Sequence, residues 1–76
     1  MILPTKHVSL DKSLLGAGAC VLSILTEPMT PTGIWEKAKH ASEIGSYGRF
    51  LLALDFLYAI RAIEMADGLI DRNERP

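Results

Sequence analysis

Residues 63–71 read IEMADGLID, and the dipeptide at their centre is the strongest local structural signal in the chain. Asp67-Gly68 stands between two short runs in which apolar residues alternate with others. An Asp-Gly pair in that setting is typical of a two-residue β-hairpin turn, because both turn positions need a positive φ. We therefore predict a C-terminal β-ribbon whose turn is formed by Asp67 and Gly68.

Two helices are predicted directly before the ribbon. One begins at Pro31, because Thr30 can cap it and proline is favoured at the first helical position, and it fades near Ser42. The next begins after the capping residue Ser46 and continues to about Ala62.

The N-terminal part predicts a strand and a further helix. Residues 2–8 contain Pro4 and β-branched residues, which favour a short extended edge strand. Ser9 or Asp11 can cap a helix that runs to about Leu25.

The order of strand, three helices and ribbon is that of a winged-helix-like α+β domain. We expect one domain over residues 1–76, with residues 72–76 as a frayed tail. Gly16 and Gly18 are costly inside a helix, so we expect another backbone to approach closely there. The predicted core residues, which recur at helical or strand spacing, are Leu14, Val21, Leu22, Leu25, Trp35, Leu52, Phe56 and Ile63.

Composition limits the possible classes of protein. The chain has 76 residues, of which 49% are hydrophobic and 22% charged, so a disordered polar chain is excluded. Its formal net charge of −1 gives no overall positive field for nucleic acid. A domain this small, with the single cysteine Cys20 and hence no internal disulfide, is usually stabilised by a partner chain, which favours a subunit.

No motif in the chain predicts catalysis, a cofactor or a metal. Gly16-Ala17-Gly18 lacks the following Lys-Ser/Thr of a phosphate-binding loop. His7 and His40 are far apart and each follows a lysine, which would oppose a bound cation. The longest apolar stretches have about a dozen residues, whereas a membrane span needs about 20. We expect a non-enzymatic, cytoplasmic protein.

The predicted third helix is apolar on nearly all sides. Ala53, Leu52, Phe56 and Ala59, with Ile60 and Ile63 beyond them, form one arc that we expect to pack on the first helix and the ribbon. The remaining arc should be polar in a free monomer. Instead it holds the residues that we predict to contact another protein: Leu54, Leu57, Tyr58 and Arg61, with Phe50 and Leu51 at the margin. Tyrosine and arginine are enriched at interface hot spots.

Three alternatives remain for this arc. The second helix, with Ile34 and Trp35, could cover part of it. A second copy of the chain could cover it in a homodimer. The helix could also bind DNA as the recognition helix of a transcriptional regulator, although its cations Arg49 and Arg61 are opposed by Asp55 and Glu64.

Several short segments, taken in order, resemble a known family. These are Leu3–His7, Ser13–Gly16, Ile34–Glu36, Arg49–Phe50, Leu52–Tyr58, Ile63–Glu64 and Asp67–Leu69. They resemble the small middle components of bacterial ABC-three component systems, and in particular the family called middle component six.

The resemblance implies partners and a cellular role. It implies a subunit encoded between an SMC/Rad50-like ABC ATPase and an effector component, in a system that defends against phage and plasmids. The ATPase would bind DNA, the effector would do the damage, and the middle protein would be a structural adaptor that meets DNA only within the complex, if at all. The family offers no catalytic residue to carry over.

Overall fold

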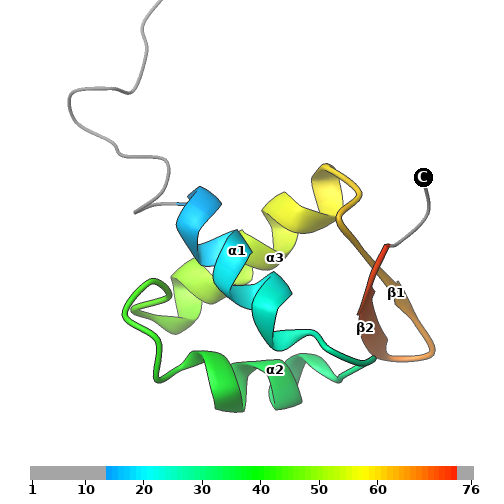
Figure 1. Ribbon diagram of the computed structural model, residues 1–76, viewed down its shortest axis with the longest axis horizontal. Coiled ribbons are helices and arrows are strands. Elements are labelled where there is room, and N and C mark those ends of the chain that lie inside the picture. Colours follow the sequence, from blue (N-terminus) through cyan, green and yellow to red (C-terminus); the bar gives the residue numbers. More distant parts are fainter. Residues whose placement is uncertain (1–13, 74–76) are drawn as a thin grey trace, which may run out of the picture.

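The computed structural model describes residues 14–73, which form three helices followed by a β-hairpin (Figure 1). The elements are α1 (Leu14–Ile24), α2 (Pro31–Ala38), α3 (Tyr47–Ala59), β1 (Ile63–Ala66) and β2 (Leu69–Arg72). The predicted α+β class, with helices first and a C-terminal ribbon, is confirmed. The predicted strand at residues 2–8 and the helix caps at Ser9 or Asp11 lie outside the described residues.

Side-chain caps begin both α2 and α3, as predicted. The Thr30 hydroxyl accepts a hydrogen bond from the Gly33 N–H at 3.0 Å, directly before Pro31. The Ser46 hydroxyl accepts one from the Arg49 N–H at 3.2 Å. Each hydroxyl satisfies one of the N–H groups that a helix start leaves without an intrahelical partner.

Both helices end earlier than predicted. Helix α2 stops at Ala38 rather than near Ser42, and α3 stops at Ala59 rather than near Ala62. At the end of α3, Arg61 takes a φ of 65° and the Ala62 N–H donates to the Leu57 carbonyl at 2.8 Å. This left-handed residue closes the helix and turns the chain into β1.

The hairpin has the predicted turn. Strands β1 and β2 are antiparallel, with Ala66 opposite Leu69, so that Asp67 and Gly68 alone form the turn. Their φ values of 57° and 79° are both positive, as a tight Asp-Gly hairpin turn requires.

A third segment, which the sequence did not predict, pairs with the hairpin. Met29, between α1 and α2, exchanges both backbone hydrogen bonds with Ile70 of β2 at 2.9 and 2.6 Å. One residue between Pro28 and Thr30 is too short for any strand pattern, so only the structure shows this bridge.

The core lies where α1, α2, α3 and the hairpin meet. Its buried hydrophobic residues are Ala17, Val21, Leu25, Ile34, Ala38, Ile44, Phe50, Ala53, Leu57, Ile63 and Ile70. Of the predicted core residues, Val21, Leu25 and Ile63 are buried, and Leu22, Trp35 and Phe56 are partly buried against the core. Leu14 is half-buried.

A close neighbour is present at Gly18, but it is a side chain and not the backbone that was predicted. A Cβ added there would stand 3.1 Å from Leu57 Cδ2, so the missing side chain lets α1 and α3 pack closely. Gly16 is half-buried.

The predicted assignment of the two arcs of α3 is wrong in part. Leu52, predicted in the core, is 55% exposed, and Ile60 of the same arc is exposed as well. Phe50 and Leu57, predicted at a partner interface, are only 1% and 2% exposed. The reason is that α2 also packs against α3: the Trp35 ring lies 5.2 Å from that of Phe50 and draws Phe50 into the core.

Candidate protein-docking site

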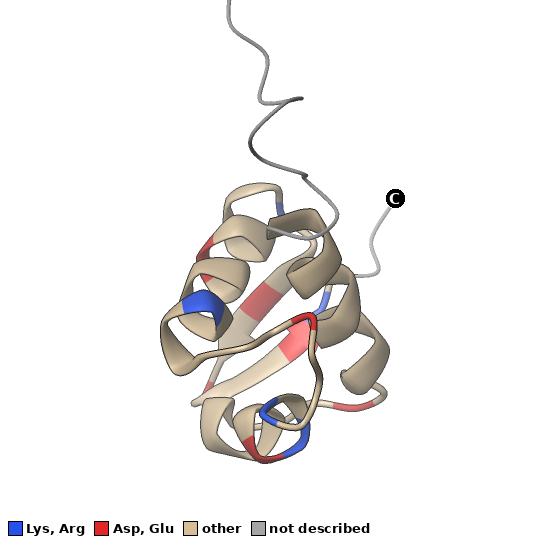
Figure 2. Ribbon diagram, turned by 90° about the vertical axis from the view of Figure 1, so that its left-hand side faces the viewer, with Lys and Arg blue, Asp and Glu red and all other residues tan. Residues whose placement is uncertain are grey.

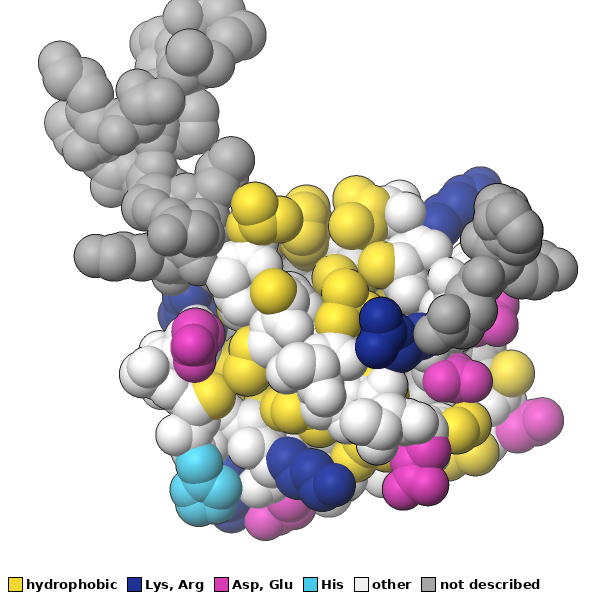
Figure 3. Space-filling view, in the orientation of Figure 1, with side chains coloured by type: hydrophobic (Ala, Val, Ile, Leu, Met, Phe, Trp, Pro, Cys, Tyr) yellow, Lys and Arg dark blue, Asp and Glu magenta, His cyan; other side chains and the backbone are white. Residues whose placement is uncertain are grey.

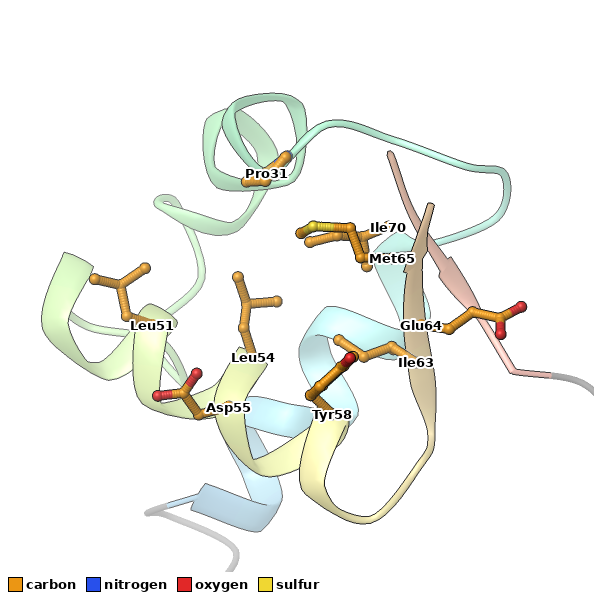
Figure 4. Close-up of a pocket in the computed structure, with 9 residues that line it drawn as sticks. All are labelled: Pro31, Leu51, Leu54, Asp55, Tyr58, Ile63, Glu64, Met65 and Ile70. Carbon is orange, nitrogen blue, oxygen red and sulfur yellow. The ribbon is translucent and has the colours of Figure 1, made fainter. Parts of the chain in front are cut away.

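An open groove of about 370 Å³ lies between α3 and the hairpin (Figure 4). Helix α3 forms one wall, β1 and β2 form the other, and the first residue of α2 closes one end. The residues that line it are Pro31, Leu51, Leu54, Asp55, Tyr58, Ile63, Glu64, Met65 and Ile70. Seven of these nine side chains are hydrophobic, so the groove is suited to bind apolar groups.

The wall formed by α3 is a helical stripe. Leu51, Leu54 and Tyr58 are spaced by three and four residues, which places them on one face of the helix. Leu51 and Tyr58 are 42% and 63% exposed, and Leu54 is half-buried against the core. Figure 4 shows all three on the side of α3 that faces the groove.

The wall formed by the hairpin depends on the strand period of two. Ile63 and Met65 share one face of β1, and Ile70 lies opposite Met65 on β2. Ile63 and Ile70 are buried and close the floor, whereas Met65 is 54% exposed at the rim. Methionine adapts its shape readily and is common on surfaces that bind partners.

The charges at the groove are acidic on both walls. Asp55 stands on α3 and Glu64 on β1, and no Lys or Arg in the described part of the chain lines the groove. In Figure 4 the Asp55 carboxylate lies between Leu51 and Leu54, while the Glu64 side chain turns outward from β1. A ligand in this groove would therefore meet an apolar floor with the Asp55 carboxylate beside it, while the Glu64 carboxylate lies on the outer side of β1.

The groove brings together three of the six residues predicted to contact a partner. Leu51, Leu54 and Tyr58 line it, whereas Phe50 and Leu57 lie in the core and have no surface to offer. Arg61 lies outside it, in a neighbouring and more polar hollow that shares Tyr58, Ile63 and Glu64 with the groove.

Pro31, Met65 and Ile70 are groove residues that the sequence interpretation did not find. The alternation of Ile63 and Met65 was a usable signal for one apolar face of β1. This face meets α3 because the chain turns at Arg61. The positive φ of Arg61 could not be predicted from a sequence pattern.

Other exposed hydrophobic residues lie away from the groove. Figure 3 shows such side chains along the upper edge of the molecule, over α1 and α3. Leu15 of α1 and Leu52 of α3 are each at least half exposed. The groove, with its two walls and apolar floor, is the better-formed site.

The cations of α3 and its flanks are not arranged as a DNA-reading surface. Arg49 donates from Nε to the Ile44 carbonyl at 2.8 Å and from Nη2 to the Glu43 carbonyl at 2.9 Å, which ties it to the loop before α3. Acidic and basic residues are interspersed over the helices and the hairpin (Figure 2). Asp71 even lies opposite Glu64 on the hairpin.

Within residues 14–73, no group of three or more His, Cys, Asp or Glu side chains could hold a metal ion. Burial, with a smaller effect of the nearby Glu43 carboxylate, raises the pKa of the half-buried Cys20 thiol. A protonated thiol is a poor nucleophile. No helix in the described part of the chain is long and apolar enough to cross a membrane.

Fold and groove together define a small α+β domain with an open apolar groove between its last helix and its C-terminal hairpin. The family model of the ABC-three component (ABC-3C) system Middle Component 6 matches residues 3–73. The chain belongs to this family. Comparison with curated proteins and with solved structures gives no match.

Proposed function

We propose that this protein is a cytoplasmic, non-enzymatic adaptor subunit of a bacterial ABC-three component defence system. It docks through the groove between α3 and the hairpin onto the SMC/Rad50-like ABC ATPase or the effector component of that system. The observation that carries the proposal is the groove itself, because its apolar side chains remain exposed after the domain has folded. Membership of the family supplies the multi-component setting.

The exposed groove residues are of the types that dominate binding energy. Tyr58 is a large, rigid side chain that is mostly exposed, and Leu51 and Met65 flank it with further apolar area. Truncating a tyrosine at the centre of an interface commonly costs about 2 kcal/mol or more of binding free energy. A few such residues are enough to hold a small subunit in a larger assembly.

The alternative role as a DNA-binding regulator has less support. Such a role needs cations and amides directed at phosphates and base edges. The exposed side of α3 instead presents Leu51, Leu52 and Tyr58 together with Asp55.

A pair of neighbouring leucines tests the docking proposal. Leu51 lines the groove and Leu52 does not, yet both are exposed on the same helix. We expect Leu51→Asp to abolish co-purification of the tagged chain with the ATPase and effector components from co-expressing cells. Leu52→Asp carries the same charge and the same helix propensity, and we expect it to retain the complex.

Three further results bear on the same experiment. Equal loss in both variants, with unchanged helical content, would contradict docking through the groove. Absence of any complex with the unsubstituted chain would contradict the adaptor role. Salt-sensitive binding of duplex DNA by the chain alone would instead support the regulator.

A further inference from the structure

Strand β1 has a free edge among the described residues. The sheet has two strands, and Ile70 of β2 gives both its backbone hydrogen bonds to Met29. Met65 lies opposite Ile70, so the N–H and C=O of Met65 cannot be bonded to that partner and point away from β2.

The next pairs along the hairpin agree with this pattern. The Asn73 N–H donates to the Ala62 carbonyl at 2.9 Å, which makes these two residues a bonded pair. Bonded and non-bonded pairs alternate in an antiparallel ladder, so Ile63 belongs to a non-bonded pair as Met65 does. The free edge therefore offers the N–H and C=O groups of both Ile63 and Met65.

This edge belongs to the groove. Three consecutive residues of β1, namely Ile63, Glu64 and Met65, line it. Side chains alternate between the two faces of a strand, so a groove confined to one face would touch Ile63 and Met65 only. The Glu64 side chain turns outward (Figure 4), so the groove meets Glu64 at the backbone of β1, next to the free groups of Ile63 and Met65.

We propose that the partner binds by adding an extended segment to the free edge of β1 as a further strand. Its backbone pairs with Ile63 and Met65, and alternate apolar side chains enter the groove against Leu54 and Tyr58. Addition of a strand to an exposed sheet edge is a recurring mode of peptide recognition, in which backbone bonds give affinity and side-chain pockets give specificity. This inference rests on the proposed adaptor function.

The acidic residues at the groove indicate which charged residues the partner segment carries. Asp55 lies beside the groove and Glu64 on the outer side of β1, and no Lys or Arg of residues 14–73 lines the groove, so the segment carries Lys or Arg beside its apolar residues. An acidic segment would meet like charge at Asp55 in the groove and at Glu64 on the neighbouring strand. We expect Asp55→Lys to weaken the complex several-fold, and Asp55→Asn to weaken it less.

A proline at the free edge tests the backbone pairing. Met65→Pro removes an N–H that points away from β2, and proline is tolerated on edge strands for that reason. Met65→Ala removes the same side chain and keeps the N–H. We expect Met65→Pro to bind the co-expressed ATPase or effector component at least 10-fold more weakly than Met65→Ala does, with melting temperatures of the two free variants that agree within a few degrees. Equal affinity of the two variants would overturn strand addition.

Hydrogen exchange gives a readout that needs no substitution. In the free chain we expect the amides of Ile63 and Met65 to exchange rapidly, and in the complex with the bound component to slow at least 10-fold. A complex that forms while both amides remain fast would overturn this inference and leave the adaptor function standing. Failure of any complex to form would overturn both.

The same measurement separates the other possible occupants. Protection that is already present in the free chain and is lost when residues 1–13 are deleted would assign the edge to this chain's own N-terminal segment, and would overturn the proposal. Protection in the free chain that increases with its concentration would assign the edge to a second copy, with the same consequence.

Discussion

Two faces of α3 carry similar apolar residues, but one face is buried in the core and the other borders an open groove. Phe50, Ala53 and Leu57 are buried, whereas Leu51, Leu54 and Tyr58, each one position further along, line an open groove. Hydrophobicity does not distinguish the two sets. What distinguishes them is the neighbouring structure: α1 with Gly18 and α2 with Trp35 pack on the first face, and the hairpin stands apart from the second. An all-apolar helix in a small domain can therefore serve the core and a docking surface at once.

The largest expected effect on stability comes from truncating a buried residue of α3, and truncation of an exposed residue of the same helix is the control. We expect Phe50→Ala to lower the free energy of unfolding by about 3–5 kcal/mol, because it removes a buried ring and leaves a cavity beside Trp35. Leu52→Ala, at a position that is 55% exposed, should change it by no more than about 0.5 kcal/mol. Urea denaturation followed by circular dichroism measures both.

The reverse order of these two effects would contradict the comparison. It would mean that the arc with Leu52 is the core face, as the sequence pattern alone had indicated.

Local signals in the sequence predicted local structure well. Thr30-Pro31, Ser46 and Asp67-Gly68 each act within a few residues, through a cap or a turn that needs particular side chains. Those signals were enough to predict the second and third helices and the ribbon. The bridge of Met29 to Ile70 joins residues 41 positions apart and leaves no such local mark.

The orientation of α3 was not predictable in the same way. A helical wheel identifies the core side by the contrast between an apolar and a polar arc, and α3 has little contrast. Leu51, Leu54 and Tyr58 were predicted to face a partner and do line the groove, but Phe50 and Leu57, predicted with them, are buried by Trp35 of α2 and by α1 at Gly18. The free edge of β1 depends on the register of the hairpin and on Met29, which only the structure supplies.

A smaller effect on stability is expected from a substitution in the hairpin, which faces α3 across the groove. Gly68 has a φ of 79°, which costs a residue with a Cβ about 1–2 kcal/mol. We expect Gly68→Ala to destabilise the domain by that amount and to loosen the hairpin side of the groove. Gly48→Ala is the matched control, since that glycine is helical with its nearest neighbour 4.0 Å from an added Cβ, and it should stabilise by about 0.5 kcal/mol. Thermal unfolding of both variants would refute the prediction if Gly68→Ala were neutral.

The smallest expected effect concerns Cys20 on α1, the helix that covers the buried face of α3. Burial, and secondarily the Glu43 carboxylate, disfavour the thiolate and raise the pKa of this thiol. The rate of alkylation by iodoacetamide should therefore rise with pH through a midpoint above that of the urea-unfolded chain, because the thiolate is the reacting form. A pKa that is higher in the folded state also means that stability is constant below the pKa of the unfolded thiol and falls as pH rises through the folded one. A midpoint at or below that of the unfolded chain would contradict the partial burial of Cys20 against the core.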